Sequence, residues 1–147
     1  MEALTRKSGF LLLFALSART FLKGVRVKLR CPMSELAIPL ATAVAVELHI
    51  ELCPATRNPI AEKKGIYTVN FIEGGYINLQ AVPKSCMREK GKVLLTDFIL
   101  NNVDKVEAFE TVIRHARSSL YGVMAVKIED EVKKYLDSKS IKRHSFL

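Results

Sequence analysis

The sequence is poor in the residues that mark loop-rich and fibrous proteins. Its 147 residues include only seven glycines and five prolines. This small share excludes a collagen-like, low-complexity or loop-dominated chain. The sequence also has no apolar run of about 18 residues, the length that a membrane-spanning helix requires.

Cysteine is also scarce, at positions 31, 53 and 86, with no C-x-x-C pair. An odd and sparse set predicts reduced thiols in the cytoplasm and not a disulfide framework. Zinc sites usually take ligands in close pairs, and Cys31, Cys53, Cys86 and His49 contain no such pair. We therefore expect small buried cysteines, no metal and no cofactor.

Positive charge is in excess. Lysine and arginine number 23 against 15 acidic residues, which gives a net charge of +8. Apolar residues make up 49% of the chain, enough for the packed core of one domain over residues 1–147. A basic, well-packed domain suggests an anionic partner, such as nucleic acid or an acidic protein.

Apolar patterns in the first half predict strands. The continuous run Gly9–Leu16 is interpreted as a central strand. Two alternating segments, residues 25–29 and 44–52, predict further strands, each ended by a Cys-Pro pair that interrupts the ladder. The N-terminal run Gly9–Leu16 is also compatible with a short secretory signal cleaved near Ser17, because cations precede it.

Two apolar runs predict a hairpin over residues 66–82. A two-residue turn at Gly74–Gly75 would place Val69 opposite Gln80 and mix apolar and polar side chains on one face. A three-residue loop pairs Val69 with Leu79 and gives one coherent apolar face. We therefore predict the three-residue loop, with a glycine at positive φ.

The second half predicts helices. Val93–Leu100 is interpreted as a strand, with a helix as the alternative. A capping box at Asp104 and apolar spacings of three and four predict a helix over residues 104–120, ended by Gly122. Either a last strand follows at 123–128, or the helix continues to residue 138.

A closing helix near residues 129–139 is expected in both cases, because acidic residues begin it and lysines end it. Residues 139–147 are expected to be a frayed basic tail. Together these elements predict an α+β fold, with a mainly antiparallel sheet of about six strands and two C-terminal helices packed on one face.

The first candidate site is a basic surface. Alternation places three cations of the segment 25–30 on one face of a strand, where they could follow phosphates. Four loop cations would extend this surface. The full set is Arg26, Lys28, Arg30, Lys84, Arg88, Lys90 and Lys92. The alternative is structural, because Glu47, His49 and Glu51 have the same period on a nearby strand and could pair with the cations.

The second candidate is Asp97, which shares a strand face with Val93, Leu95 and Ile99. Burial would raise the pKa of its carboxyl unless a cation pairs with it, and a perturbed carboxyl in a cleft suits acid–base catalysis. The alternatives are a buried ion pair or an exposed edge.

Two functional hypotheses follow. Because no catalytic or phosphate-cradling motif is present, the first is a non-enzymatic binding or assembly subunit that engages nucleic acid or an acidic partner, and that could be a homo-oligomer. The second is a small enzyme with a pocket between sheet and helices, which uses Asp97 and a nearby lysine or arginine. A cytoplasmic location is expected, and secretion after cleavage is the alternative.

Overall fold

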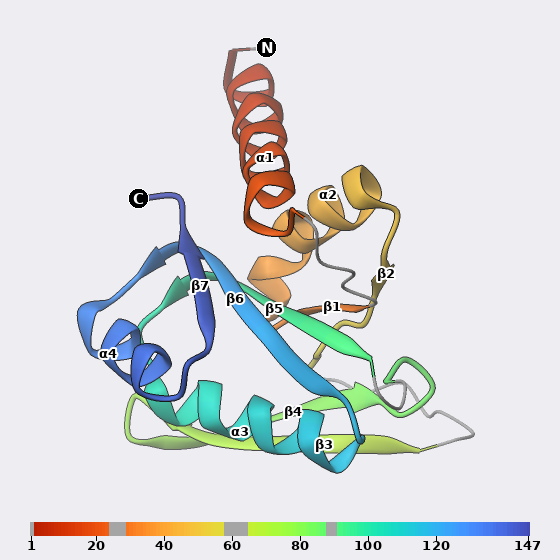
Figure 1. Ribbon diagram of the computed structural model, residues 1–147, viewed down its shortest axis with the longest axis vertical. Coiled ribbons are helices and arrows are strands. Elements are labelled where there is room, and N and C mark those ends of the chain that lie inside the picture. The colour runs from red at the N-terminus through yellow and green to blue at the C-terminus, as the bar shows by residue number, and fades with distance from the viewer. Residues whose placement is uncertain (1, 24–28, 58–64, 88–90) are drawn as a thin grey trace.

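A parallel sheet forms the centre of the protein. The computed structural model describes residues 2–23, 29–57, 65–87 and 91–147 (Figure 1). The sheet has the order β2-β1-β5-β6-β7, and every neighbouring pair is parallel. Its strands are β1 (Leu29–Pro32), β2 (Glu51–Leu52), β5 (Lys92–Leu100), β6 (Ser119–Ile128) and β7 (Lys142–Ser145). The remaining strands, β3 (Ile66–Glu73) and β4 (Tyr76–Pro83), form a separate antiparallel hairpin.

Helices supply the crossovers that parallel strands require. The helices are α1 (Glu2–Phe21), the short 3₁₀ helix η1 (Glu35–Ala37), α2 (Ile38–Leu48), α3 (Val103–His115) and α4 (Asp130–Ser138). In chain order, α2 connects β1 to β2, α3 connects β5 to β6, and α4 connects β6 to β7. None of the described helices is long and apolar enough to cross a membrane.

The sheet is buried on both faces. Val93 and Leu95 of β5 pack in one core with residues of α3, α4 and the hairpin. Leu94, between them, packs in a second core with residues of α1 and α2. Figure 1 shows α1 and α2 on one side of the sheet and α3 with the hairpin on the other. The result is a three-layer α/β architecture.

The expected α+β fold with a mainly antiparallel six-stranded sheet is therefore wrong. The predicted strand Val93–Leu100 is present as β5, but its partners on both sides are parallel. Its nearly continuous apolar sequence is typical of a central strand covered by helices on both faces. Two segments predicted as strands are helices, which removes the hairpins that an antiparallel sheet would need.

The first of these segments is Gly9–Leu16, which lies within α1. Phe14, Ala18 and Leu22 are buried at a spacing of four, whereas Leu12 and Leu13 are exposed. Burial thus follows the helical period of 3.6 residues and not the period of a strand. A short apolar run does not distinguish the two structures by itself.

The second segment, residues 44–52, is helical up to Leu48. Pro39 stands in the first turn of α2, where its missing N–H costs nothing. Within the acidic row that was expected to face the cations, Glu47 instead forms an ion pair with Arg19 of α1. Glu51 lies in β2, three residues after the end of α2. The acidic row is therefore not on a single strand. Arg26 and Lys28, two of its expected partners, lie outside the described residues, so the cross-strand pairing stays a prediction.

The hairpin turns over two residues and not over three. Gly74 and Gly75 both have positive φ, at 61° and 79°, as a type I′ turn requires. The positive φ is as predicted, but the register is not, because Val69 lies opposite Gln80. Gln80, the polar side chain that made this register unfavourable in the sequence analysis, faces the interior.

The C-terminal helices are as expected in number, but their ends differ. The first of them ends at His115, where Arg117 takes a φ of 57° and reverses the chain. Gly122 is therefore no helix cap and lies inside β6. The single long helix to residue 138 is also wrong. The closing helix is present as α4, and residues 142–145, expected in a frayed tail, form β7 against β6.

Docking of β7 depends on Gly122. A Cβ at this position would lie 2.7 Å from the carbonyl oxygen of Lys142 and 3.2 Å from the Phe21 ring. Gly122→Ala should therefore lower the free energy of unfolding by about 1–3 kcal/mol. Gly9→Ala is the control, since open space surrounds Gly9 within α1 and alanine favours helix by about 0.5–1 kcal/mol. Urea unfolding measures both, and an equally stable Gly122→Ala protein would contradict this packing.

His144 gives β7 a dependence on pH. Its ring stacks on Phe21, with centroids 5.4 Å apart, and burial lowers its pKa. Because the unfolded chain then binds more protons, stability should decrease as pH falls below about 6.5. His144→Phe should lose less stability than the wild type between about pH 7.5 and about pH 5.5 in chemical unfolding. Equal losses in the two proteins would contradict the assignment.

Candidate functional site

A cavity of about 460 Å³ opens at the carboxyl ends of β1 and β5. From β1 the chain continues to β2 at one edge of the sheet, and from β5 it continues to β6 on the other side. The crevice between β1 and β5 is therefore the point where the strand order reverses, which is where open α/β sheets bind ligands. Its lining residues are Ser34, Glu35, Leu36, Arg57, Glu73, Gln80, Asp97, Phe98, Ile99, Asn101 and Lys105.

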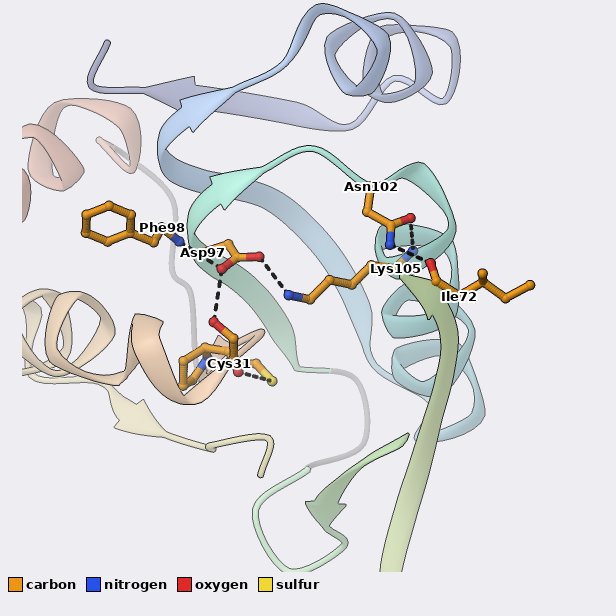
Figure 2. A network of polar contacts seen from close by, with 8 residues as sticks. Cys31, Ile72, Asp97, Phe98, Asn102 and Lys105 are labelled. Atoms are coloured by element: carbon orange, nitrogen blue, oxygen red, sulfur yellow. Dashed lines mark hydrogen bonds and ion pairs between the residues drawn. The ribbon is translucent and has the colours of Figure 1, made fainter. Parts of the chain in front are cut away.

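Asp97 lines this cavity and is only 3% exposed. Its Oδ2 pairs with Lys105 Nζ at 3.0 Å, and its Oδ1 accepts hydrogen bonds from Ser34 Oγ at 3.1 Å and from the Phe98 N–H at 2.8 Å. Figure 2 shows the carboxylate between Lys105 and Phe98. The two structural alternatives for Asp97 were a buried ion pair and an exposed edge. The structure shows the buried ion pair, in the wall of a cavity.

Three elements meet at this carboxylate. Ser34 directly precedes η1 and follows β1, Asp97 belongs to β5, and Lys105 lies in the first turn of α3. The Lys105 ammonium also lies 5.5 Å from the centroid of the Phe71 ring, on the hairpin. Since a carboxylate has about four acceptor positions, the three bonds leave Asp97 room for one more donor from a ligand.

The amino end of α3 is occupied by the protein itself. Asn102 caps the helix by accepting from the Lys105 N–H, and its Nδ2 donates to the Ile72 carbonyl oxygen at 2.7 Å (Figure 2). Asp104 accepts from the Ile72 N–H at 2.7 Å. The N-cap thus lies two residues before the one predicted, Asp104, and the helix begins at Val103. Its end is bound to the hairpin, and Asp104 brings negative charge to a place that could otherwise hold an anion.

The other walls of the cavity combine polar and apolar groups. Gln80 is 4% exposed, and its Oε1 has no hydrogen-bond partner among the described residues. The Arg57 backbone N–H donates to Glu35, while its guanidinium makes no ion pair with the carboxylates that the structure describes. Leu36 and Phe98 expose apolar surface at the same site.

The structure describes only part of the predicted basic surface. Lys84 lies 5.2 Å from the centroid of the Tyr67 ring, and Lys92 is an exposed residue at the start of β5. Arg30 lies in β1. The other four predicted cations, Arg26, Lys28, Arg88 and Lys90, lie outside the described residues. Neither Lys84 nor Lys92 lines the cavity.

The cysteines belong to the core. Cys31 and Cys53 are fully buried and Cys86 is partly buried, all within the core that contains Val69. Burial raises the pKa of the Cys31 thiol to about 12, and it raises that of Cys53 as well. Such thiols are weak nucleophiles. Within the described ranges, no group of three histidine, cysteine or acidic residues is placed to hold a metal ion.

Sequence reasoning found one residue of the cavity, Asp97, and expected an unspecified cation near it. It missed Ser34, Arg57 and Lys105, because contact between β1, β2 and α3 depends on the parallel topology. Gln80 did give a signal, a polar residue opposite the apolar Val69. In the sequence this pairing argues against the two-residue turn, which is the turn that the structure has.

Similarity to known proteins is visible in the structure and not in the sequence. No protein-family model and no curated protein matches the chain. The adenine phosphoribosyltransferase of Thermoanaerobacter pseudethanolicus matches with a TM-score of 0.80 at 10% identity, over 96% of this chain and 81% of that one. The APRTase of Giardia lamblia, complexed with 9-deazaadenine, matches with a TM-score of 0.83 at 15% identity, over 98% and 82%.

A third structure carries more ligands. The adenine phosphoribosyltransferase of Trypanosoma brucei, in complex with AMP, pyrophosphate and ribose-5-phosphate, matches with a TM-score of 0.80 at 12% identity, over 96% of this chain and 65% of that one. The chain has the phosphoribosyltransferase fold. The three matched proteins are enzymes, and this finding contradicts the expectation of a non-enzymatic subunit that engages nucleic acid.

The buried ion pair is open to a direct test. Lys105→Met keeps the length of the side chain but leaves the Asp97 carboxylate buried without a counter-charge, so it should cost about 3–5 kcal/mol of stability. Combining it with Asp97→Asn should cost less than the sum of the two single changes. Arg143→Met is the control, because it breaks the exposed pair with Asp137 and should have little effect. Additive losses in thermal unfolding would contradict the pairing.

Proposed function

We propose that this protein is an enzyme that binds a phosphorylated ribose compound, such as a nucleotide, in the cavity between β1 and β5. The observation that carries the proposal is the position of this cavity at the reversal of strand order, with the buried Asp97 in its wall. Its volume of about 460 Å³ falls in the usual range of small-molecule sites.

The acceptor groups of the cavity suit hydroxyl and N–H donors. Asp97 has one unused acceptor position, and Glu35 and Glu73 add two further carboxylates. A ribose presents adjacent hydroxyl groups that donate well to carboxylates, as charge-assisted hydrogen bonds. We therefore assign Asp97 to the binding of a ligand hydroxyl, held in place by Lys105. Its use as a general acid or base stays a prediction.

The anionic end of the ligand requires a different part of the cavity. The amino end of α3, a common phosphate site in other proteins, is occupied by Asn102 and Asp104. Arg57 is the lining cation that makes no ion pair within the described ranges, whereas Lys105 is paired with Asp97. Arginine binds phosphate oxygens in a bidentate fashion. We therefore assign the phosphate to Arg57.

The reaction that we propose is phosphoribosyl transfer. The fold is shared with adenine phosphoribosyltransferases, one of them in complex with AMP, pyrophosphate and ribose-5-phosphate. In the direction that starts from a nucleotide, the bond between ribose and base breaks, pyrophosphate forms the new bond to the ribose, and the base leaves with the proton that hydrogen pyrophosphate gives up. Leu36 and Phe98 provide apolar surface on which a planar base can lie.

The test is release of adenine from AMP in the presence of pyrophosphate, followed by chromatography. Mg²⁺ is included because it accompanies phosphate substrates. The wild type should release adenine only when pyrophosphate is present, and Asp97→Asn should reduce the rate about 10–100-fold through loss of a charged hydrogen bond. Asp137→Asn is the matched control, because Asp137 is an exposed, ion-paired acid outside the cavity.

Calorimetry with AMP separates the site from the reaction. Binding of AMP without release of adenine would reject phosphoribosyl transfer from AMP and keep the proposed site. If the wild type neither binds AMP nor releases adenine, the proposed function is contradicted. Equal loss in Asp97→Asn and Asp137→Asn would reject the assignment of Asp97.

A further inference from the structure

Gln80 is the one glutamine of the sequence, and it lies in an unusual place. It belongs to β4 and faces the same side of the hairpin as Val69, which is buried. The side chain is 4% exposed and lines the cavity, and its Oε1 accepts no hydrogen bond from any described residue.

An unpaired acceptor in this position opposes folding. A buried polar atom without a partner loses its hydrogen bonds to water and gains none in return. An apolar residue at position 80 would continue the face formed by Val69 and Phe71 and would avoid this cost. Buried groups that break a local rule in this way are concentrated at functional sites.

We propose that Gln80 is a specificity-determining residue whose Oε1 accepts a hydrogen bond from an N–H or O–H group of the bound ligand. The inference deepens the proposed function and rests on it. The geometry has two parts: the side chain lines the same cavity as Asp97, and its unpaired atom is an acceptor. Protein atoms cover this oxygen, so the amide has to turn toward the cavity to meet a ligand. Ligand binding would supply the missing donor, so the amide contributes to affinity only when a donor is present.

A nucleotide offers such donors from two sources, the N–H groups of the base and the hydroxyl groups of the ribose. Three probes distinguish them. Adenine carries only the N–H donors, ribose 5-phosphate carries only the hydroxyls, and AMP carries both. Each is titrated by calorimetry into the wild type and into Gln80→Met, which keeps the length of the side chain and removes the amide.

The expected result is weaker binding of AMP to Gln80→Met by about 2–10-fold, the effect of one hydrogen bond. The same loss should appear with adenine alone if the base is the donor, or with ribose 5-phosphate alone if the ribose is. Asn70→Leu is the matched control. It removes an amide from the exposed, opposite face of the hairpin and should leave all three affinities unchanged.

A second measurement does not depend on ligand. Because Gln80→Met removes an unpaired buried acceptor, the ligand-free variant should melt at a temperature on the order of 2–4 °C higher than the wild type. The expected combination is therefore a more stable protein that binds less well. A purely structural glutamine would give the opposite, a less stable protein with unchanged affinity.

The outcomes separate the two proposals. If the wild type binds the probes and Gln80→Met binds them equally well, the inference on Gln80 is overturned and the proposed function remains. If the wild type binds none of the three, the proposed function fails. In that case the melting temperature alone decides on Gln80. A higher melting temperature of Gln80→Met supports an acceptor kept for a ligand, and an unchanged or lower one overturns the inference.

Discussion

The ion pair between Lys105 and Asp97 is the interaction on which the candidate site depends. It is almost fully buried, and it connects β5 to the first turn of α3, while Ser34 brings the end of β1 to the same carboxylate. Two buried charges are costly to desolvate, so such a pair persists only with good geometry and further hydrogen bonds. Here both conditions hold, and the crevice between β1 and β5 is fixed as a result.

Elements defined by local pattern were predictable from the sequence, and elements defined by pairing were not. The strand at Val93–Leu100 and the closing helix near 129–139 have clear local signals, and both are present as β5 and α4. Parallel pairing of β5 with β1 and β6 leaves no comparable local signal, because the partners are separated by long crossovers. The apolar run Gly9–Leu16 fits strand and helix equally well, and only its packing against α2 and the sheet makes it a helix.

The hairpin shows how a buried polar residue can mislead a physical argument. Opposite Val69, the sequence offered Leu79 under one register and Gln80 under the other, and an apolar partner is the better choice for a core. In the structure Gln80 lies opposite Val69, and at this point the inner face of the hairpin forms the wall of a cavity. Asp97 on β5 is a second buried polar residue in this wall, and it lies on a strand as the sequence predicted, while its catalytic use stays a prediction.

Net charge misled for a related reason. The chain as a whole is strongly basic, yet the cavity is lined by three acids, Glu35, Glu73 and Asp97, against two cations, Arg57 and Lys105. One of these cations is already neutralised by Asp97. A total charge describes how a protein interacts at long range, but recognition in a pocket depends on the few groups that remain unpaired there. In this cavity those groups are mostly acceptors, which favours a ligand rich in hydroxyl and N–H donors with a single anionic end.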